Sequence, residues 1–266
     1  MNKRFCSVAG SFYPSDAASI EKMIFDFNQV IDAHPEIADQ LKRLGAKAAI
    51  VPHAGWVYSG FTANFAYRVL QSLPWSSVVV IGPSHRVGFE GSSISDVEQY
   101  ETPLGTIPID RELVGELRSR FDLPYFPQAH HEHSTEVQMP FIRHYLPNVK
   151  VVELVYAYAQ PQQIEPIIDY LLEKENMGVV ISTDLSHFHT LEKANRLDRI
   201  CLDAIRTENS QLLHEGCEAC GAIGVEAMLN VAKRRELTST VLDYRTSADA
   251  SGDASRVVGY VSALFE

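Results

Sequence analysis

Two histidines stand just after apolar segments of the chain, where their imidazoles could bind a metal ion. His53 follows the apolar segment 48–51, and His85 follows the β-branched segment 78–81 and a Gly-Pro turn. Two imidazoles and one carboxylate on one side of an ion leave coordination positions open, as in non-haem Fe(II) oxygenases, and Zn²⁺ uses similar ligands. Either histidine alone is also explained by an imidazole that satisfies loop carbonyls at a strand end. The pair predicts a mononuclear metal site.

A third apolar segment, 179–182, leads to Asp184 and, three residues later, to His187. Because an imidazole titrates near neutral pH, His187 could transfer a proton, and Asp184 could orient it. A helix cap at Asp184 and a surface position for His187 are the structural alternative. We expect both side chains at the same edge of the fold as the two histidines above.

The three apolar segments predict buried strands, because β-branched residues continue through them without polar alternation. Amphipathic segments at 20–31 and 61–70 predict helices that cover the strands. The sequence therefore predicts one α/β domain over residues 1–266, with a mixed, largely parallel sheet covered by helices on both faces. In such sheets ligands bind beyond the carboxyl ends of the strands. Segment 86–109, rich in glycine, predicts short strands or a hairpin outside the main sheet.

Further polar and aromatic side chains could contribute to a pocket. In segment 130–136, His133 and Glu136 would share one face of a short helix. They could line the pocket or complete a metal shell, and a solvated helix start explains them equally well. The loop after the first histidine carries Trp56 and Tyr58 between glycines. Such a loop predicts either a pocket wall or a tight corner.

Charge and composition argue against several classes of partner. The chain of 266 residues has a net charge of −11, which argues against nucleic acid, because phosphate binding requires clustered Lys and Arg. No segment approaches the ~18 consecutive apolar residues of a membrane span. The basic N-terminus is not followed by the apolar run of a secretory signal. We therefore expect a cytoplasmic protein that binds neither nucleic acid nor a membrane.

The four cysteines are too few and too unevenly spaced for a disulfide framework. Cys217 and Cys220 have a CxxC spacing, but no second pair exists to close a zinc site. A structural role is the simpler interpretation, and Cys220 as a nucleophile beside a histidine is a competing enzyme hypothesis. No G-x-G-x-x-G, P-loop or G-x-S-x-G motif is present. Nucleotide binding and α/β-hydrolase chemistry therefore lose their main support.

Several separate motifs, taken in order, resemble the MEMO family. They are Ala9-Gly10-Ser11-Phe12-Tyr13-Pro14, Val51-Pro52-His53-Ala54-Gly55, Gly82-Pro83-Ser84-His85, Glu132-His133-Ser134-Thr135-Glu136, Ser182-Thr183-Asp184-Leu185-Ser186-His187 and Cys220-Gly221. The resemblance covers nearly the whole chain and implies a fold like that of the class III extradiol dioxygenases of the LigB type. It also implies that His53 and His85 bind a metal and that Asp184 and His187 lie at the pocket. In the dioxygenases an equivalent histidine acts as acid and base.

One position departs from the family pattern. Animal members carry a cysteine ligand in the C-terminal loop, and ungapped comparison places Ala250 there. A methyl group cannot coordinate a metal. Asp249, Asp253 or Asp184 would then replace the cysteine, or two histidines and water complete the site, or the protein binds no metal firmly. We favour Asp249 as the third ligand.

The resemblance implies two alternative functions. The first is a non-haem iron dioxygenase or oxidoreductase of a small molecule, with Fe(II) favoured and copper or zinc as alternatives. The second is a non-catalytic module that binds a peptide or protein in the same pocket, since animal members are described as adaptors that bind phosphopeptides. Microbial members occur beside AMMECR1-like and radical-SAM proteins, which are expected partners. The expected pocket residues are Trp56, Tyr58, His133, Glu136 and Cys220.

Overall fold

The middle strands of the central sheet, β2, β3, β7 and β8, are buried on both faces along most of their length. The computed structural model describes residues 2–266, and within them this sheet has eight strands. Seven follow the order β10-β11-β2-β8-β3-β7-β4, and β9 pairs with β11. Their bounds are β2 Ala48–Val51, β3 Ser77–Pro83, β4 Gly91–Ile94, β7 Lys150–Ala157, β8 Met177–Ser182, β9 His187–His189, β10 Ser239–Thr246 and β11 Val257–Phe265.

The middle of this sheet is parallel. Strands β2, β8, β3 and β7 run in one direction, whereas β4 and β11 run antiparallel to their neighbours. Ile181 of β8 pairs with Ile50 of β2 on one side and with Ile81 of β3 on the other. The carboxyl ends of these strands therefore reach the same edge of the sheet, from which the loops that carry the candidate ligands continue.

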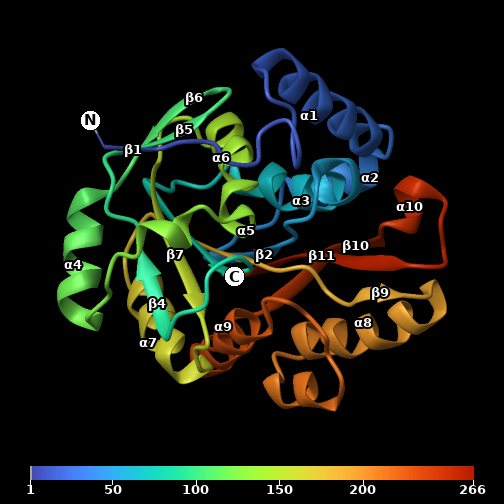
Figure 1. Ribbon diagram of the computed structural model, residues 1–266. Coiled ribbons are helices and arrows are strands. Elements are labelled where there is room, and N and C mark those ends of the chain that lie inside the picture. The colour runs from blue at the N-terminus through green and yellow to red at the C-terminus, as the bar shows by residue number, and fades with distance from the viewer. Residues whose placement is uncertain (1) are drawn as a thin grey trace.

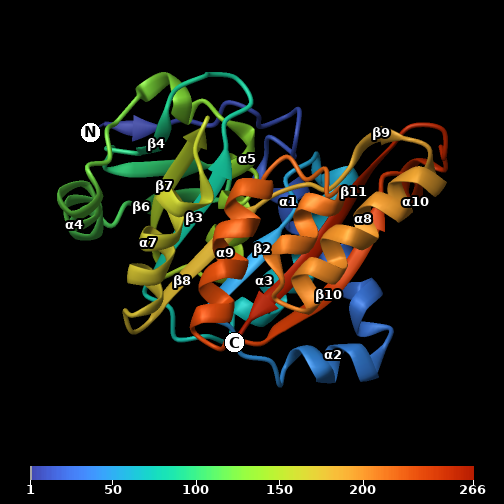
Figure 2. The same ribbon diagram turned by 90° about the horizontal axis from the view of Figure 1, so that it is seen from below.

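Helices cover both faces of the sheet (Figures 1 and 2). Helix α3 packs on β2, β10 and β11, while α7 and α9 pack on β8, and α8 packs on β10 and β11. In Figure 1 the sheet lies between α1, α2 and α3 above and α7, α8 and α9 below. The predicted α/β fold, with helices on both faces of a mixed, largely parallel sheet, is confirmed. The helices are α1 Ala17–Asp32, α2 Pro35–Leu41, α3 Trp56–Leu70, α4 Arg111–Phe121, α5 His133–Glu136, α6 Met139–Tyr145, α7 Pro161–Leu172, α8 Leu191–Arg206, α9 Ala222–Arg234 and α10 Ala248–Ser251.

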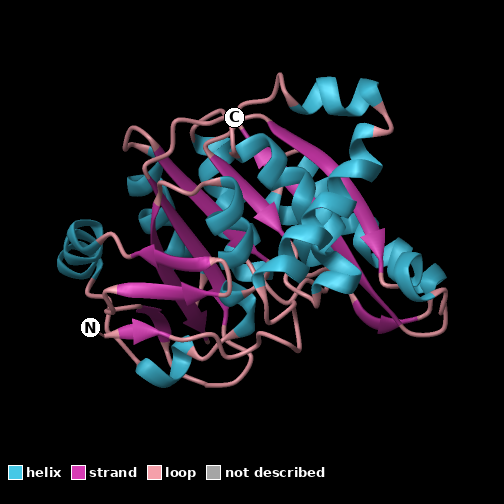
Figure 3. Cartoon of the chain, turned by 90° about the horizontal axis from the view of Figure 1, so that it is seen from above, coloured by secondary structure: helices cyan, strands magenta, loops and turns pink. Residues whose placement is uncertain are grey.

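A small second sheet lies beside the N-terminus (Figure 3). Strand β1, Lys3–Arg4, pairs in parallel with β5, Gln99–Thr102, and β5 forms an antiparallel hairpin with β6, Gly105–Pro108. The prediction of a hairpin outside the main sheet is confirmed for β5 and β6. It is wrong for β4 in the same segment, because β4 pairs with β7 and extends the main sheet at its edge.

Helix α8 is joined covalently to the loop before α9. Cys201 of α8 and Cys217 form a disulfide, with 16 residues of sequence separation. The spacing of the cysteines did not predict this bond. In the sequence, Cys201 is one of the apolar residues on the buried face of its helix, and nothing there indicates a partner cysteine. The bond fixes the loop that continues to Cys220.

None of the helices within residues 2–266 combines the length and the apolar character that crossing a membrane requires.

Candidate metal centre

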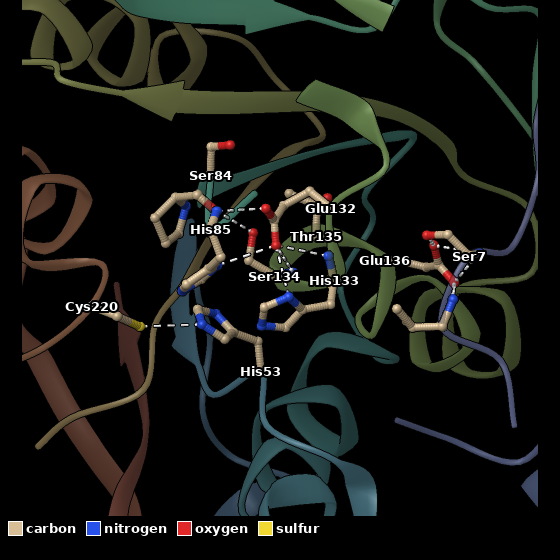
Figure 4. Close-up of polar contacts among 12 residues, drawn as sticks. Ser7, His53, Ser84, His85, Glu132, His133, Ser134, Thr135, Glu136 and Cys220 are labelled. Carbon is tan, nitrogen blue, oxygen red and sulfur yellow. Dashed lines mark hydrogen bonds and ion pairs between the residues drawn. The ribbon is translucent and has the colours of Figure 1, made fainter. Parts of the chain in front are cut away.

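Three imidazoles meet at the carboxyl edge of the central sheet (Figure 4). His53 follows β2 and His85 follows β3, and their ring centroids lie 5.1 Å apart. His133, the first residue of α5, adds a third ring, 4.5 Å from that of His85 and 5.5 Å from that of His53. The register of the parallel strands explains why the first two rings converge, as expected from the sequence. His133 arrives from a separate segment that packs over β3.

Hydrogen bonds orient the ring of His53. Its Nδ1 lies 3.1 Å from Ser182 Oγ, and this hydroxyl donates to the carbonyl of Ser134 at 2.5 Å. Because the hydroxyl proton is used in that bond, Ser182 accepts from the Nδ1–H group of His53. The lone pair of Nε2 is then free to bind a metal.

A buried carboxylate orients the ring of His85 in the same way. Glu132 accepts from the backbone N–H of His85 at 2.6 Å, and its Oε1 lies 3.1 Å from His85 Nδ1. Burial raises the pKa of Glu132, but the neighbouring imidazoles of His133 and His85 outweigh this and hold the pKa well below its usual range. An ionised Glu132 therefore accepts the Nδ1 proton, which leaves the Nε2 lone pair of His85 as the coordinating group.

Cys220 supplies a sulfur beside the two histidines. Its Sγ lies 3.2 Å from His53 Nε2, and candidate ligand atoms of His53, His85 and Cys220 all lie within 4.8 Å of one another. Cys220 lies in the loop before α9, where its backbone N–H donates to the Asp184 carbonyl at 3.2 Å. Two nitrogens and one sulfur form a donor set that transition metals accept. The residues present therefore fit a mononuclear metal ion.

The protonation states of these groups follow from their burial. Burial and the neighbouring imidazoles of His85 and His133 lower the pKa of His53 well below its usual value. The ring is thus neutral near pH 7, as a metal ligand must be. Burial, with Asp184 nearby, raises the pKa of the Cys220 thiol to about 12. A metal ion that binds Cys220 would therefore displace its proton.

Asp184 and His187 lie next to this group. Asp184 Oδ1 accepts from the backbone N–H of His53 at 2.7 Å and from that of Ala54 at 3.3 Å, so the carboxylate holds the loop after β2. Burial raises the pKa of Asp184, and the hydrogen bond from His53 opposes that effect. His187 begins β9, is half-buried, and is close enough to lower the pKa of His53.

The structure places two other sequence candidates, Trp56 and Glu136, away from the imidazoles. Trp56 is buried in the core, where it stacks on Phe141 at 3.8 Å between centroids. Glu136 accepts from the backbone N–H groups of Ser7 and Val8 at 2.8 Å and pairs with Arg4, so it anchors the N-terminal arm. Figure 4 shows this contact apart from the histidines.

Asp249 and Ala250 belong to α10, at a different hollow from the histidine cluster. Asp249 accepts from the backbone N–H of Thr246 at 2.8 Å, and it lines a cavity of about 250 Å³ together with Ala250 and Tyr58. Within residues 2–266, the side-chain groups close enough to hold a metal include Cys220 and do not include Asp249. The sequence placed Cys220 in the pocket but not among the candidate metal ligands, although the Cys220-Gly221 motif was a usable signal.

Comparison with known proteins supports a relationship over the whole chain. A family model described as Memo-like protein matches residues 4–264. A "MEMO1 family protein" of Aquifex aeolicus is 32% identical over 282 residues, covering 100% of both chains. A "MEMO1 family protein" of Methanobrevibacter smithii is 33% identical over 277 residues, covering 98% of each chain. A further relative from Thermotoga sp. strain RQ2 is 32% identical, covering 98% of this chain and 99% of its own length.

Proposed function

The chain belongs to the Memo-like protein family, and from that premise we propose that it binds one redox-active transition-metal ion at His53, His85 and Cys220 and oxidises a small molecule. The observation that carries this proposal is the convergence of two imidazole nitrogens and one thiol within 4.8 Å. Each histidine has its other nitrogen held by a buried partner, as is usual for metal ligands. A histidine cluster with only a structural role would not require the thiol.

The donor set narrows the choice of metal. Fe(II) was favoured from the sequence on the assumption of a carboxylate as third ligand. A thiolate is a softer ligand, which strengthens the argument for copper and keeps iron as the second candidate. Zinc also accepts two nitrogens and one sulfur, but it supplies no redox chemistry. We therefore propose copper or iron, with zinc as the outcome that would restrict the protein to non-redox chemistry.

The metal ion and the side chains around its ligands would have different roles in the reaction. A bound copper or iron ion would supply the dioxygen and electron-transfer chemistry that side chains lack. His187, half-buried beside the cluster, is the side chain that would accept or donate a proton. Asp184 would fix the loop of His53 through its hydrogen bond to the backbone N–H group. The substrate would enter through a cavity whose wall includes His85 and Cys220.

Spectroscopy of the copper-loaded protein tests this proposal. Metal-free protein is titrated with Cu(II) while the visible charge-transfer absorption from thiolate to copper is recorded. We expect one equivalent to produce this band, and Cys220→Ser to abolish it. The matched control is Cys6→Ser. Within residues 2–266, Cys6 is the other free cysteine, its thiol donates to the Glu101 carbonyl, and it belongs to no group of side chains close enough to hold a metal.

Oxygen uptake by the copper-loaded and iron-loaded proteins, with ascorbate as the electron donor, tests the redox part separately. We expect uptake by the wild type and by Cys6→Ser, and none by Cys220→Ser. If the protein holds only zinc and shows no oxygen uptake with copper or iron, the proposal that it is an oxidoreductase is overturned. Retention of the copper band in Cys220→Ser would overturn the ligand assignment.

A further inference from the structure

A cavity of about 400 Å³ opens beside the metal centre. His85 and Cys220 form part of its wall, and the remainder comes from segment 83–88, segment 156–158 and Ile223. Its volume lies in the range of small-molecule sites. A ligand in this cavity would therefore lie against two of the three proposed metal ligands.

The residues that line the cavity are less acidic than the protein as a whole. They include no aspartate or glutamate, although the chain carries a net charge of −11. Arg86 is the permanently charged side chain in the wall, directly after the ligand His85. It is exposed, and within residues 2–266 it forms no hydrogen bond or ion pair. The guanidinium of Arg86 and the proposed metal ion are two positive charges beside one cavity, so they favour an anionic ligand. The N–H groups of a guanidinium pair bidentately with a carboxylate or a phosphate.

Tyr158 gives the same cavity a flat aromatic wall. It directly follows β7, has a φ of 36° and is 72% exposed. A non-glycine residue in this left-handed region is uncommon, and such conformations concentrate at functional sites. The ring lies against Gly88, where an added Cβ would be 2.8 Å from both Cε2 and Oη of Tyr158. Gly88 thus leaves room for a tyrosine ring that could stack on a planar ligand.

We propose that this cavity binds a planar, negatively charged small molecule. Its anionic group pairs with Arg86, and its ring packs against Tyr158. The inference deepens the proposed function, on which it depends for the reaction but not for binding. Arg86 is thereby the residue that selects the substrate by charge, and the same fork accepts a carboxylate or a phosphate.

Binding of matched probes tests the charge preference. Benzoate and benzamide have the same ring and nearly the same size but differ in charge, and phenyl phosphate provides the second kind of anion. Dissociation constants are measured by NMR titration, with metal-free and with zinc-loaded protein. We expect the wild type to bind one or both anions at least about fivefold more tightly than benzamide, as a single charge-assisted contact at a partly exposed site provides.

Substitutions assign the preference to particular side chains. Arg86→Gln removes it, whereas Arg86→Lys retains part of it. Arg199→Gln keeps the wild-type preference, because Arg199 is also exposed and without a side-chain partner within residues 2–266 but lies on α8. Tyr158→Leu weakens the binding of all three probes to the same extent, because each contains the same ring, and Tyr158→Phe binds them like the wild type.

Several results would overturn the inference. Equal binding of benzoate, phenyl phosphate and benzamide, no binding of any probe, or equal losses in Arg86→Gln and Arg199→Gln would each do so. The proposed function fails separately. If the protein binds copper or iron but shows no preference for anionic probes, only the inference of an anionic ligand is contradicted. If it prefers anionic probes but binds neither copper nor iron, only the proposed metal site is contradicted. Tighter binding of benzoate than of phenyl phosphate would identify the ligand's anionic group as a carboxylate, and the reverse would identify it as a phosphate.

Discussion

The Sγ atom of Cys220 lies 3.2 Å from Nε2 of His53, although 167 residues separate the two in the chain. The histidine comes from the end of a parallel strand and the cysteine from the loop before a helix on one face of the sheet. Both are held by Asp184, whose carboxylate accepts from the backbone of His53 and whose carbonyl accepts from that of Cys220. The fold thus brings a nitrogen and a sulfur donor together and fixes both backbones.

Glu132→Gln should weaken metal binding without removing a ligand. The carboxylate accepts from the backbone and faces the Nδ1 atom of His85, and the amide would lose one of these acceptors. Loss of such an outer partner typically costs about 10–100-fold in metal affinity. Competition titration with a chelator measures the loss. Glu98→Gln, at an exposed carboxylate, is the control and should bind like the wild type; equal affinities of the two variants would contradict the role of Glu132.

Gly221→Ala and Gly115→Ala should have opposite effects. A Cβ at Gly221 would lie 2.6 Å from Thr183 Cβ and 2.9 Å from the Ser182 carbonyl oxygen, so the loop of Cys220 must move away from β8. We expect a lower unfolding free energy and weaker metal binding. At Gly115, inside α4, a Cβ meets nothing within 4 Å, and alanine should stabilise by up to about 1 kcal/mol. Denaturant unfolding and metal titration of both variants give the comparison.

The disulfide should stabilise the fold and the loop of the proposed thiol ligand. It closes a loop with a sequence separation of 16, for which constraint of the unfolded chain gives about 3 kcal/mol. Reductant should therefore lower the denaturant midpoint of the wild type, and it should leave a Cys201→Ala/Cys217→Ala variant unchanged. Because Cys217 precedes Cys220 by three residues, reduction should also weaken metal binding. An unaffected wild-type midpoint would show that the bond contributes nothing.

Stability should fall in acid partly through Glu153. Burial raises the pKa of this carboxylate, but His130, Arg4 and Thr135 outweigh it and hold the pKa below its usual value. A folded pKa below the unfolded one gives stability that is present above about pH 4.5 and is lost as the pH falls through the folded pKa. The unfolding free energy of Glu153→Gln should depend less on pH below 4.5 than that of the wild type. Parallel pH profiles would exclude this contribution.

Strand patterns predicted the parts of the site that depend on local sequence. Apolar segments ending in His53, His85 and Asp184 indicated the carboxyl edge of a parallel sheet, because buried parallel strands need no polar alternation. Cys220 carried no such pattern, since its position depends on how α9 docks against β8. Asp249 was favoured as a ligand from its loop, but that loop forms α10, where Asp249 binds the backbone of Thr246.

Two further features depended on contacts that spacing does not encode. Glu136 shares a short helix with His133, as the sequence indicated, yet it points to the N-terminal arm, where Arg4 supplies a buried positive charge. Cys201 belongs to the apolar stripe of α8, and only the tertiary packing brings Cys217 to it. Local periodicity assigns a residue to a buried face, whereas the partner on that face is set by the fold.

Elemental analysis is the most direct test of the central claim, that His53, His85 and Cys220 hold one redox-active metal ion. The protein is purified without an affinity tag and under anaerobic conditions, beside a His53→Ala/His85→Ala variant and the Cys6→Ser control. The account predicts about one equivalent of copper or iron in the wild type and the control, and almost none in the double variant. Equal metal content in the wild type and the double variant, or no copper or iron in any of the three proteins, would contradict it.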